Sequence, residues 1–397
     1  MNSTHISPEN SGKLAKTLGY YAAFIVLGLI TGIFGPTLAD LVRNTQTTLN
    51  QISIIFVARS LGYLAGSFLA GRLYDRVRGH WVLAIGLLAT AFAFILIPAV
   101  SLLALLVIVV FALGIAEGSI DVGGNSLIVW VHHARVGPFM NGLHFFFGIG
   151  AFISPIVIAQ VVLSIGDFRW AYWLLALLTL PLALWFTRLP SPAIEHTSQR
   201  AEQTQRNPLL LGLIAALLFV YVGAETGYGN WIFTYATRLA LADATSAAIL
   251  TSTFWGTFTL GRLLGVPIST RAKPATIILI DVMGCIASVA GMILFPQSQW
   301  VLWLSTIGAG LFMASIFPTA LALAGQHMTI TASVTGWFLI CSGLGAMLFP
   351  WLIGQLIDPL GANVLPRLIL GTLLIDVLIA GVIALKVFTT QEQQEGK

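Results

Sequence analysis

The feature that most constrains the fold is a succession of twelve apolar runs, each long enough to cross a lipid bilayer as a helix. Inside lipid, every backbone N–H and C=O must find a partner within the segment, which leaves helices as the solution for runs of about 20 residues. Hydrophobic residues make up 57% of the chain and charged residues 9%, against roughly 25% charged in a soluble domain. We therefore predict an all-α, multi-pass protein of the cell membrane. The expected spans are 19–40, 52–73, 81–99, 103–130, 139–165, 169–188, 208–237, 246–267, 275–295, 300–325, 333–356 and 364–388.

Two motifs recur 195 positions apart and indicate a duplicated chain. The segment FGIGAFISP (147–155) returns as SGLGAMLFP (342–350), and a Gln follows each Pro by five positions, at 160 and 355. GLITG (28–32) returns as GAETG (223–227) with the same offset. A parallel duplication in a membrane protein is typical of transporters in which two bundles rock about a central site.

The halves are expected to be two pseudo-symmetric six-helix bundles joined by a polar linker. The long polar connection lies near 189–207, which gives bundles at 1–188 and 208–397. Orientation follows from Lys and Arg, which concentrate on the cytoplasmic side of membrane proteins. With the N-terminus inside, the outer side holds only Arg43, Arg169, Arg238 and Arg367, so both termini and the linker are expected to be cytoplasmic.

Other sequence features exclude several classes of protein. The net charge of +4 comes from loop residues that set topology and gives no reason to expect a nucleic-acid partner. Cys285 and Cys341 both fall in apolar runs, which fits neither a disulfide framework nor a metal cluster. The first 18 residues are polar and lack the apolar core of a signal peptide.

The loop after the second span reads GRLYDRVRGH (71–80) and resembles the Gly-x-x-x-Asp-Arg-x-Gly-Arg-Arg/Lys loop of the major facilitator superfamily. Its first six positions match, and its last three depart. The resemblance implies the fold of that superfamily, with alternating access. It also implies that Gly71, Asp75, Arg76 and Arg78 form a gating loop that latches the bundles on the cytoplasmic side in the outward-facing state. The alternative is that the positive charge only holds the loop inside.

The fourth and fifth spans narrow the resemblance. EGSIDVGGN (117–125) is similar to the Glu-Thr-Ala-Ala-Asn signature of the fucose permease branch, with Asp121 for Glu and Asn125 for Asn. NGLHFFFGIGAFISP (141–155) looks like the next span of that branch, and closer still to the related sodium-dependent glucose transporters. The resemblance implies that Asp121 carries the coupling proton, with Glu117 or His144 as its helper, and that nearby amides, including Asn125 and Asn141, bind sugar. The first span departs from the branch because it has no acidic residue.

Charges inside spans are costly and are functional candidates by default. Glu117, Asp121 and Asn125 are spaced four apart, which places them on one face of a helix. A structural ion pair between Glu117 and Arg59 is the alternative. His144 is expected at a similar depth to Asp121 and is a second candidate for proton sharing, although a histidine bonded between helices explains it equally well.

The seventh span offers a carboxylate, a phenol, an amide and an indole in Glu225, Tyr228, Asn230 and Trp231. Such groups suit a sugar, which presents hydroxyls to polar side chains and C–H faces to aromatic rings. Glu225 and Tyr228 are expected to share a face. Trp231 can instead belong to an aromatic belt at the membrane surface. Trp255 and Trp337 are weaker candidates for the same site.

Three classes of function remain to be weighed. The leading hypothesis is secondary active transport of a small polar solute, with a sugar as the first expectation, by symport with H+ or Na+ and no other cofactor. The chain is expected to work as a monomer. The alternative is a proton-driven exporter of amphipathic compounds. A membrane enzyme or receptor is disfavoured because no nucleotide loop, metal cluster or nucleophile–base motif is found.

Overall fold

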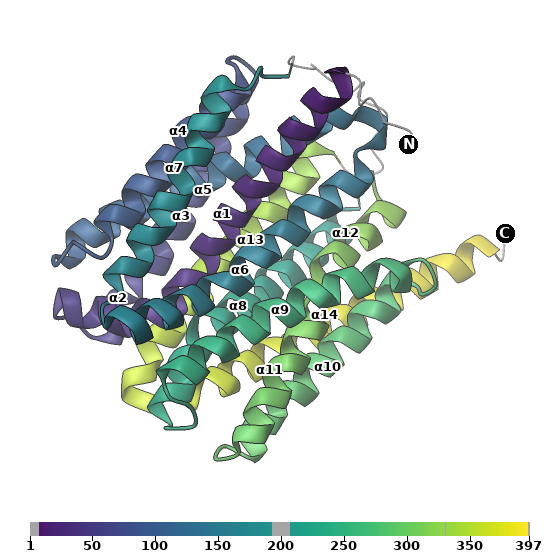
Figure 1. The fold of residues 1–397 in the computed structure, drawn as a ribbon. Helices are drawn as coiled ribbons and strands as arrows, with labels where there is room; N and C mark the ends of the chain where they lie inside the picture. The colour runs from purple at the N-terminus through teal and green to yellow at the C-terminus, as the bar shows by residue number, and fades with distance from the viewer. Residues whose placement is uncertain (1–7, 193–206, 330, 396–397) are drawn as a thin grey trace, which may run out of the picture.

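The computed structural model describes residues 8–192, 207–329 and 331–395, and all regular structure in these ranges is helical (Figure 1). The elements, with η1 a short 3-10 helix, are α1 (Pro8–Thr45), α2 (Leu49–Ile52), α3 (Ile54–Tyr74), α4 (Gly79–Leu96), α5 (Leu103–His132), η1 (His133–Arg135), α6 (Gly137–Ile165), α7 (Arg169–Arg188), α8 (Pro208–Arg238), α9 (Ala244–Ser269), α10 (Pro274–Leu294), α11 (Gln299–Met313), α12 (Ile316–His327), α13 (Ala332–Leu360) and α14 (Val364–Glu395).

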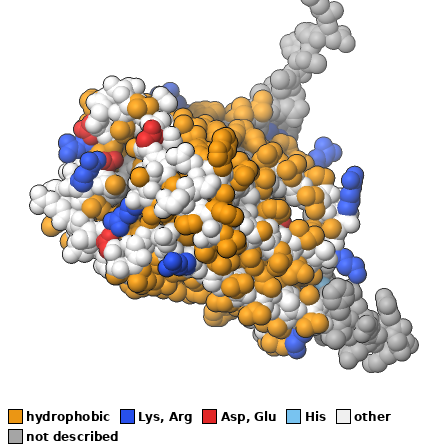
Figure 2. All heavy atoms as spheres, turned by 90° about the horizontal axis from the view of Figure 1, so that it is seen from below, with side chains coloured by type: hydrophobic (Ala, Val, Ile, Leu, Met, Phe, Trp, Pro, Cys, Tyr) orange, Lys and Arg blue, Asp and Glu red, His pale blue; other side chains and the backbone are white. Residues whose placement is uncertain are grey.

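These helices confirm the predicted fold class. In the described part of the chain, eleven segments are long and apolar enough to cross a membrane, with α2 and α3 forming one of them and α11 and α12 another. The remaining predicted span, 246–267, corresponds to α9, which has 26 residues but is richer in Ser and Thr. Apolar side chains cover the middle of the face seen in Figure 2, and Lys and Arg lie toward its two ends. The protein is therefore a multi-pass membrane protein.

The tenth span is interrupted, where the sequence predicted one continuous helix over 300–325. Helix α11 ends at Met313 and α12 begins at Ile316, with a turn at Ala314 and Ser315 between them. The cause is Pro318, which has no N–H to donate to the carbonyl of Ala314 and whose ring clashes with that carbonyl. The break leaves backbone groups in the interior of the protein that need other partners.

Close contacts between glycines organise both halves in the same way. A Cβ placed on Gly150 of α6 would lie 3.0 Å from the Cα of Gly28 on α1. A Cβ on Gly345 of α13 would lie 3.2 Å from the backbone N of Gly223 on α8. The two repeated sequence motifs are therefore the two surfaces of one helix crossing, present once in each half, and any larger residue there forces the helices apart.

The helices of the first half gather at the upper left of Figure 1 and those of the second half at the lower right, with α1, α6, α8, α9 and α13 in the centre. Across the halves, α6 packs along α9, α3 against α13 and α1 against α8. Helix α7 ends at Arg188 and α8 begins at Pro208. Most of the predicted linker, residues 193–206, lies outside the described residues, so the domain boundaries stay a prediction.

Candidate functional site

The polar site of the first half is built on a close crossing of α3 and α5. Each helix contributes two glycines four positions apart, at 62 and 66 on α3 and at 114 and 118 on α5. A Cβ on Gly62 would lie 3.1 Å from the Cα of Gly114, so the backbones touch along this line. Side chains beside the glycines are thereby held face to face in a row.

The first pair in this row is a salt bridge between Arg59 and Glu117. The Arg59 Nε lies 2.9 Å from one carboxylate oxygen and an Nη 2.7 Å from the other, which makes the pair bidentate. The same guanidinium donates to the hydroxyl of Thr31 on α1 at 3.1 Å. Both charged side chains are largely buried, at 14% and 10% exposed. The structural ion pair that the sequence left open for Glu117 is therefore present.

One turn further along α5, Asp121 accepts two hydrogen bonds. The hydroxyl of Tyr63 on α3 donates to it at 2.5 Å, and the amide of Asn125 donates to its other oxygen at 3.0 Å. Asp121 and Asn125 are half-buried. The structure brings together Glu117, Asp121 and Asn125 on one face, as their spacing predicted, and supplies the carboxylate of Asp121 with donors on both sides.

Among the described residues, no hydrogen bond joins His144 or Asn141 to this row. The His144 ring stacks edge to face on Phe24, with ring centroids 5.9 Å apart, and its side chain is exposed. It makes no hydrogen bond to Asp121. The two residues were expected at similar depth, but α5 packs mainly on α3, whereas α6 packs on α1 and α9. Asn141 is also exposed.

The polar site of the second half centres on Tyr221 and Glu225 of α8. The Tyr221 hydroxyl lies 2.6 Å from a carboxylate oxygen of Glu225 and 2.6 Å from the backbone carbonyl of Met313. Met313 is the last residue of α11, at the break in the tenth span. Tyr228 does not join this site, because its hydroxyl is buried against Thr306 at 2.9 Å.

Two further candidates on α8 and α9 have polar atoms without a partner. Asn230 donates from its amide nitrogen to the carbonyl of Thr226, but its buried Oδ1 has no partner among the described residues. The buried Nε1 of Trp255 likewise has none. A Cβ on Gly229 would lie 2.6 Å from the Trp255 ring, so this indole packs closely on α8.

Trp231 differs from Trp255 because its indole nitrogen already has a hydrogen-bond acceptor. It is fully buried and donates to the carbonyl of Pro350 at 2.9 Å, so it belongs to no surface belt. Its ring also lies 6.0 Å from that of Phe56 in the other half. These contacts make Trp231 part of the packing between the halves.

Arg262 on α9 is a charge inside a span that forms no ion pair among the described residues. Its guanidinium carbon lies 4.6 Å from the ring centroid of Phe258, and its buried Nε has no acceptor. Both Glu225 and His144 lie within its electrostatic range. The side chain is half-buried.

The gating loop lies at the end of the molecule near the N-terminus, and its charged side chains make no ion pair with the described residues of the second half. Asp75, Arg76 and Arg78 are exposed, and none makes an ion pair within the described part of the chain. A Cβ on Gly71 would meet nothing within 4 Å. Among the described residues, the three charged side chains therefore form no latch to the second half in this conformation.

At the opposite end, hydrogen bonds close the two halves against each other. The amide of Gln355 on α13 donates to the carbonyl of Asn50 at 2.9 Å and to the hydroxyl of Ser53 at 3.0 Å. The backbone N–H of Asn50 donates to Asp358 at 3.2 Å, and Asp358 also pairs with Arg238 at 2.8 Å. We call this set the closed end.

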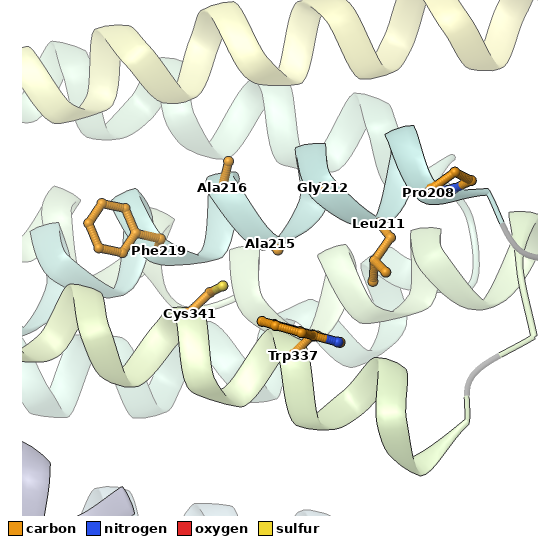
Figure 3. A pocket seen from close by; sticks show the side chains of 8 residues that line it. All are labelled: Pro208, Leu211, Gly212, Ala215, Ala216, Phe219, Trp337 and Cys341. Atoms are coloured by element: carbon orange, nitrogen blue, oxygen red, sulfur yellow. The ribbon is translucent and has the colours of Figure 1, made fainter.

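A surface hollow of about 410 Å³ lies between α8 and α13, lined by Pro208, Leu211, Gly212, Ala215, Ala216, Phe219, Trp337 and Cys341 (Figure 3). Trp337 is the single predicted site residue in this lining, and it is 55% exposed. The lining is apolar, while the acids and amides lie elsewhere. The hollow therefore adds nothing to a site for a polar solute.

Sequence reasoning missed Tyr63 and Tyr221, the two phenols that hold the acidic residues. Each has a signal in the sequence, since Tyr63 lies four positions after Arg59 and Tyr221 four before Glu225. That spacing puts each phenol on the face of its helix that carries a charge.

Comparison with known proteins adds independent evidence. A family model described as Major Facilitator Superfamily matches residues 20–350. The Mus musculus protein named sodium-dependent glucose transporter 1A is 31% identical over 376 residues, which cover 85% of this chain and 88% of the mouse chain. The Homo sapiens sodium-dependent glucose transporter 1 is 32% identical over 374 residues, covering 84% and 72%.

Two solved structures share the fold at low sequence identity. The nucleoside transporter NupG aligns with a TM-score of 0.70 and 15% identity, covering 94% of this chain and 98% of that chain. A bacterial homolog of the human lysosomal transporter Spinster aligns with a TM-score of 0.68 and 15% identity, covering 96% and 97%. At this identity the likeness supports the arrangement of helices alone.

Proposed function

The chain belongs to the Major Facilitator Superfamily and is a secondary active transporter of a small solute, and we propose that this solute is a sugar moved in symport with H+ or Na+. The relatives named sodium-dependent glucose transporters support a sugar and favour Na+. The expectation of a monomer accords with one chain containing both halves.

The observation that carries the proposal is the pair of unpartnered buried atoms on α8 and α9. Asn230 offers an acceptor and Trp255 a donor, and neither has a partner among the described residues. Buried polar groups are nearly always hydrogen-bonded, and we infer that a ligand supplies the missing bond at these two atoms. A sugar hydroxyl both donates and accepts, and the indole ring can contact its C–H face.

The coupling ion is assigned to the first half on the basis of charge. Glu117 is neutralised by Arg59, and His144 makes no hydrogen bond to Asp121. Asp121 has hydrogen-bond donors but no positively charged partner among the described residues, so we keep Asp121 as the residue that binds the coupling ion. Asn125 orients its carboxylate.

The topology assigned from Lys and Arg places the closed end outside and the gating loop in the cytoplasm. Under that assignment the conformation is inward-facing. The free gating loop supports this view, because its latch is expected to form only when the cytoplasmic side closes. Asp75→Ala is then expected to slow transport while the protein still inserts into the membrane.

The test is uptake of labelled D-glucose and other sugars into proteoliposomes with an imposed H+ or Na+ gradient. Accumulation of at least one sugar supports the proposal. Uptake of none, together with drug resistance on overexpression, establishes the exporter instead. Trp255→Phe is expected to weaken uptake without lowering the unfolding temperature, since the lost N–H has no protein partner.

Trp231→Phe is the matched control for that variant. It removes an indole N–H that is bonded to Pro350, so the unfolding temperature is expected to fall. Equal stability loss in both variants contradicts the assignment of Trp255 to the solute site.

A further inference from the structure

Glu225 on α8 and Arg262 on α9 each keep a hydrogen-bonding atom that no described residue uses. Tyr221 contacts one carboxylate oxygen of Glu225, and no hydrogen bond from the described residues reaches the other oxygen. The buried Nε of Arg262 has no acceptor in the described structure. Glu225 therefore offers a free acceptor, and Arg262 a free donor.

This arrangement repeats the one formed by Asn230 and Trp255. There too, α8 provides an unpartnered acceptor and α9 an unpartnered donor. The two helices are consecutive spans that run in opposite directions, and α8 ends at Arg238 in the closed end. Asn230 and Trp255, the first level, therefore lie nearer the closed end than Glu225 and Arg262, the second level. At 1.5 Å per residue, the levels are about 7.5 Å apart on α8 and about 10 Å apart on α9.

The charges of the second level attract each other without forming an ion pair among the described residues. Arg59, an arginine within a span of the first half, instead donates to Glu117 and Thr31. An arginine inside a span is costly unless its charge and its N–H groups are matched. One oxygen that accepts from the Arg262 guanidinium and donates to the Glu225 carboxylate would satisfy both groups.

A hydroxyl group has this property, since it has one hydrogen to donate and two lone pairs that accept. A solute carboxylate would be repelled by Glu225, and a solute ammonium by Arg262. The second level therefore suits an uncharged, hydroxyl-bearing solute. A pyranose ring carries hydroxyls on opposite edges, so a sugar bound at the first level can present its far edge to the second.

The second level also lies where the two halves meet. Thr259 precedes Arg262 by three positions on α9, and a Cβ on Gly148 of α6 would clash with the Thr259 side chain. His144, one turn before Gly148 on α6, lies within electrostatic range of Arg262. A solute held by Arg262 thus lies beside the seam whose geometry changes when the two halves rock.

We propose that Glu225 and Arg262 bind one hydroxyl of a neutral sugar, and that Arg262 selects the sugar by the position of that hydroxyl. This inference rests on the proposed sugar transport and names a specificity-determining residue for it. A guanidinium is planar and donates in fixed directions, so it recognises a hydroxyl in one orientation. A sugar that lacks this hydroxyl leaves both Glu225 and Arg262 without a partner.

The test is competition against uptake of labelled D-glucose into proteoliposomes by glucose analogues that each lack one hydroxyl. In the wild type, one analogue is expected to bind about 10- to 150-fold more weakly than D-glucose, because it loses hydrogen bonds to charged groups. In Arg262→Met, D-glucose is expected to weaken to the level of that analogue, so the preference between the two disappears. Trp255→Phe is the matched control and is expected to remove the preference for a different hydroxyl, at the first level.

Arg262→Lys keeps a positive charge near Glu225 and is expected to fold even if the methionine variant does not; its preference for the same hydroxyl is expected to be reduced. The amino sugar with its ammonium at the identified carbon is expected to compete more strongly in Arg262→Met than in wild type, because the repelling charge is gone.

Two results overturn the inference and leave sugar transport intact. The first is an unchanged preference among all analogues in both Arg262 variants. The second is loss of preference for the same hydroxyl in Arg262→Met and Trp255→Phe. Uptake of no sugar by the wild type overturns the proposed function itself, and the inference with it.

Discussion

Removal of the Gln355 side chain is expected to open the closed end. Gln355→Ala deletes two hydrogen bonds between the halves, to the Asn50 carbonyl at 2.9 Å and the Ser53 hydroxyl at 3.0 Å. Each hydrogen bond contributes about 0.5–1.5 kcal/mol net, so the loss is about 1–3 kcal/mol. That free energy shifts the ratio of closed to open molecules by about 5- to 150-fold.

The measurement is the distance distribution between two spin labels at the closed end. Gln46→Cys and Leu360→Cys place labels on exposed positions in the two halves, with Cys341→Ala to remove the half-buried thiol. In the Gln355→Ala protein, the population at long distance is expected to rise. This experiment does not require the identity of the transported solute.

The duplication supplies a control within the same chain. Gln160 occupies the position of Gln355 in the first copy of the repeat, but its exposed side chain makes no hydrogen bond among the described residues. Gln160→Ala is expected to leave the distances unchanged. If both variants shift the distances equally, or if neither does, the reasoning from these two bonds is wrong.

Three further predictions concern stability, measured as the thermal unfolding temperature in detergent. Glu117→Ala is expected to destabilise the protein by about 3–5 kcal/mol because it leaves the charge of Arg59 unpaired, and replacement of both by Leu is expected to recover much of the loss. Gly150→Ala is expected to lower the unfolding temperature, whereas Gly371→Ala, which meets nothing within 4 Å, is expected to stabilise by up to about 1 kcal/mol. Asp376→Asn is expected to be neutral or stabilising, because neither buried carboxylate oxygen has a partner in the described structure; a lower unfolding temperature contradicts this.

Most of the fold could be predicted from the sequence because lipid leaves apolar runs few alternatives to a helix. Helices α5, α7 and α8 begin where their apolar runs begin. The interruption after Met313 was missed, although Pro318 signals it, because the run of apolar residues continues across the break. Hydropathy records whether a segment can lie in lipid and not whether its hydrogen bonds are continuous.

The candidate site was less predictable because it depends on which helices face each other. Spacing along one helix correctly put Glu117, Asp121 and Asn125 in a row. The same reasoning predicted that Tyr228 and Glu225 share a face. The Tyr228 hydroxyl instead contacts Thr306 on α11. Tyr63 and Tyr221 were missed because a tyrosine in an apolar span cannot be distinguished by sequence from an ordinary core residue. Its hydrogen-bond partner is known only once the packing of the helices is known.

The paired glycine contacts also bear on how the protein is made. Gly28 on α1 finds its close partner only when Gly150 on α6 has left the ribosome and entered the membrane. Until then, the face of α1 that carries Gly28 has no helix packed closely against it. In the second half, α8 likewise lacks its close partner until α13 has been synthesised and inserted. Each half is thus completed by its own late helix, and a chain divided between Arg188 and Pro208 into two co-expressed polypeptides is expected to assemble into a working protein.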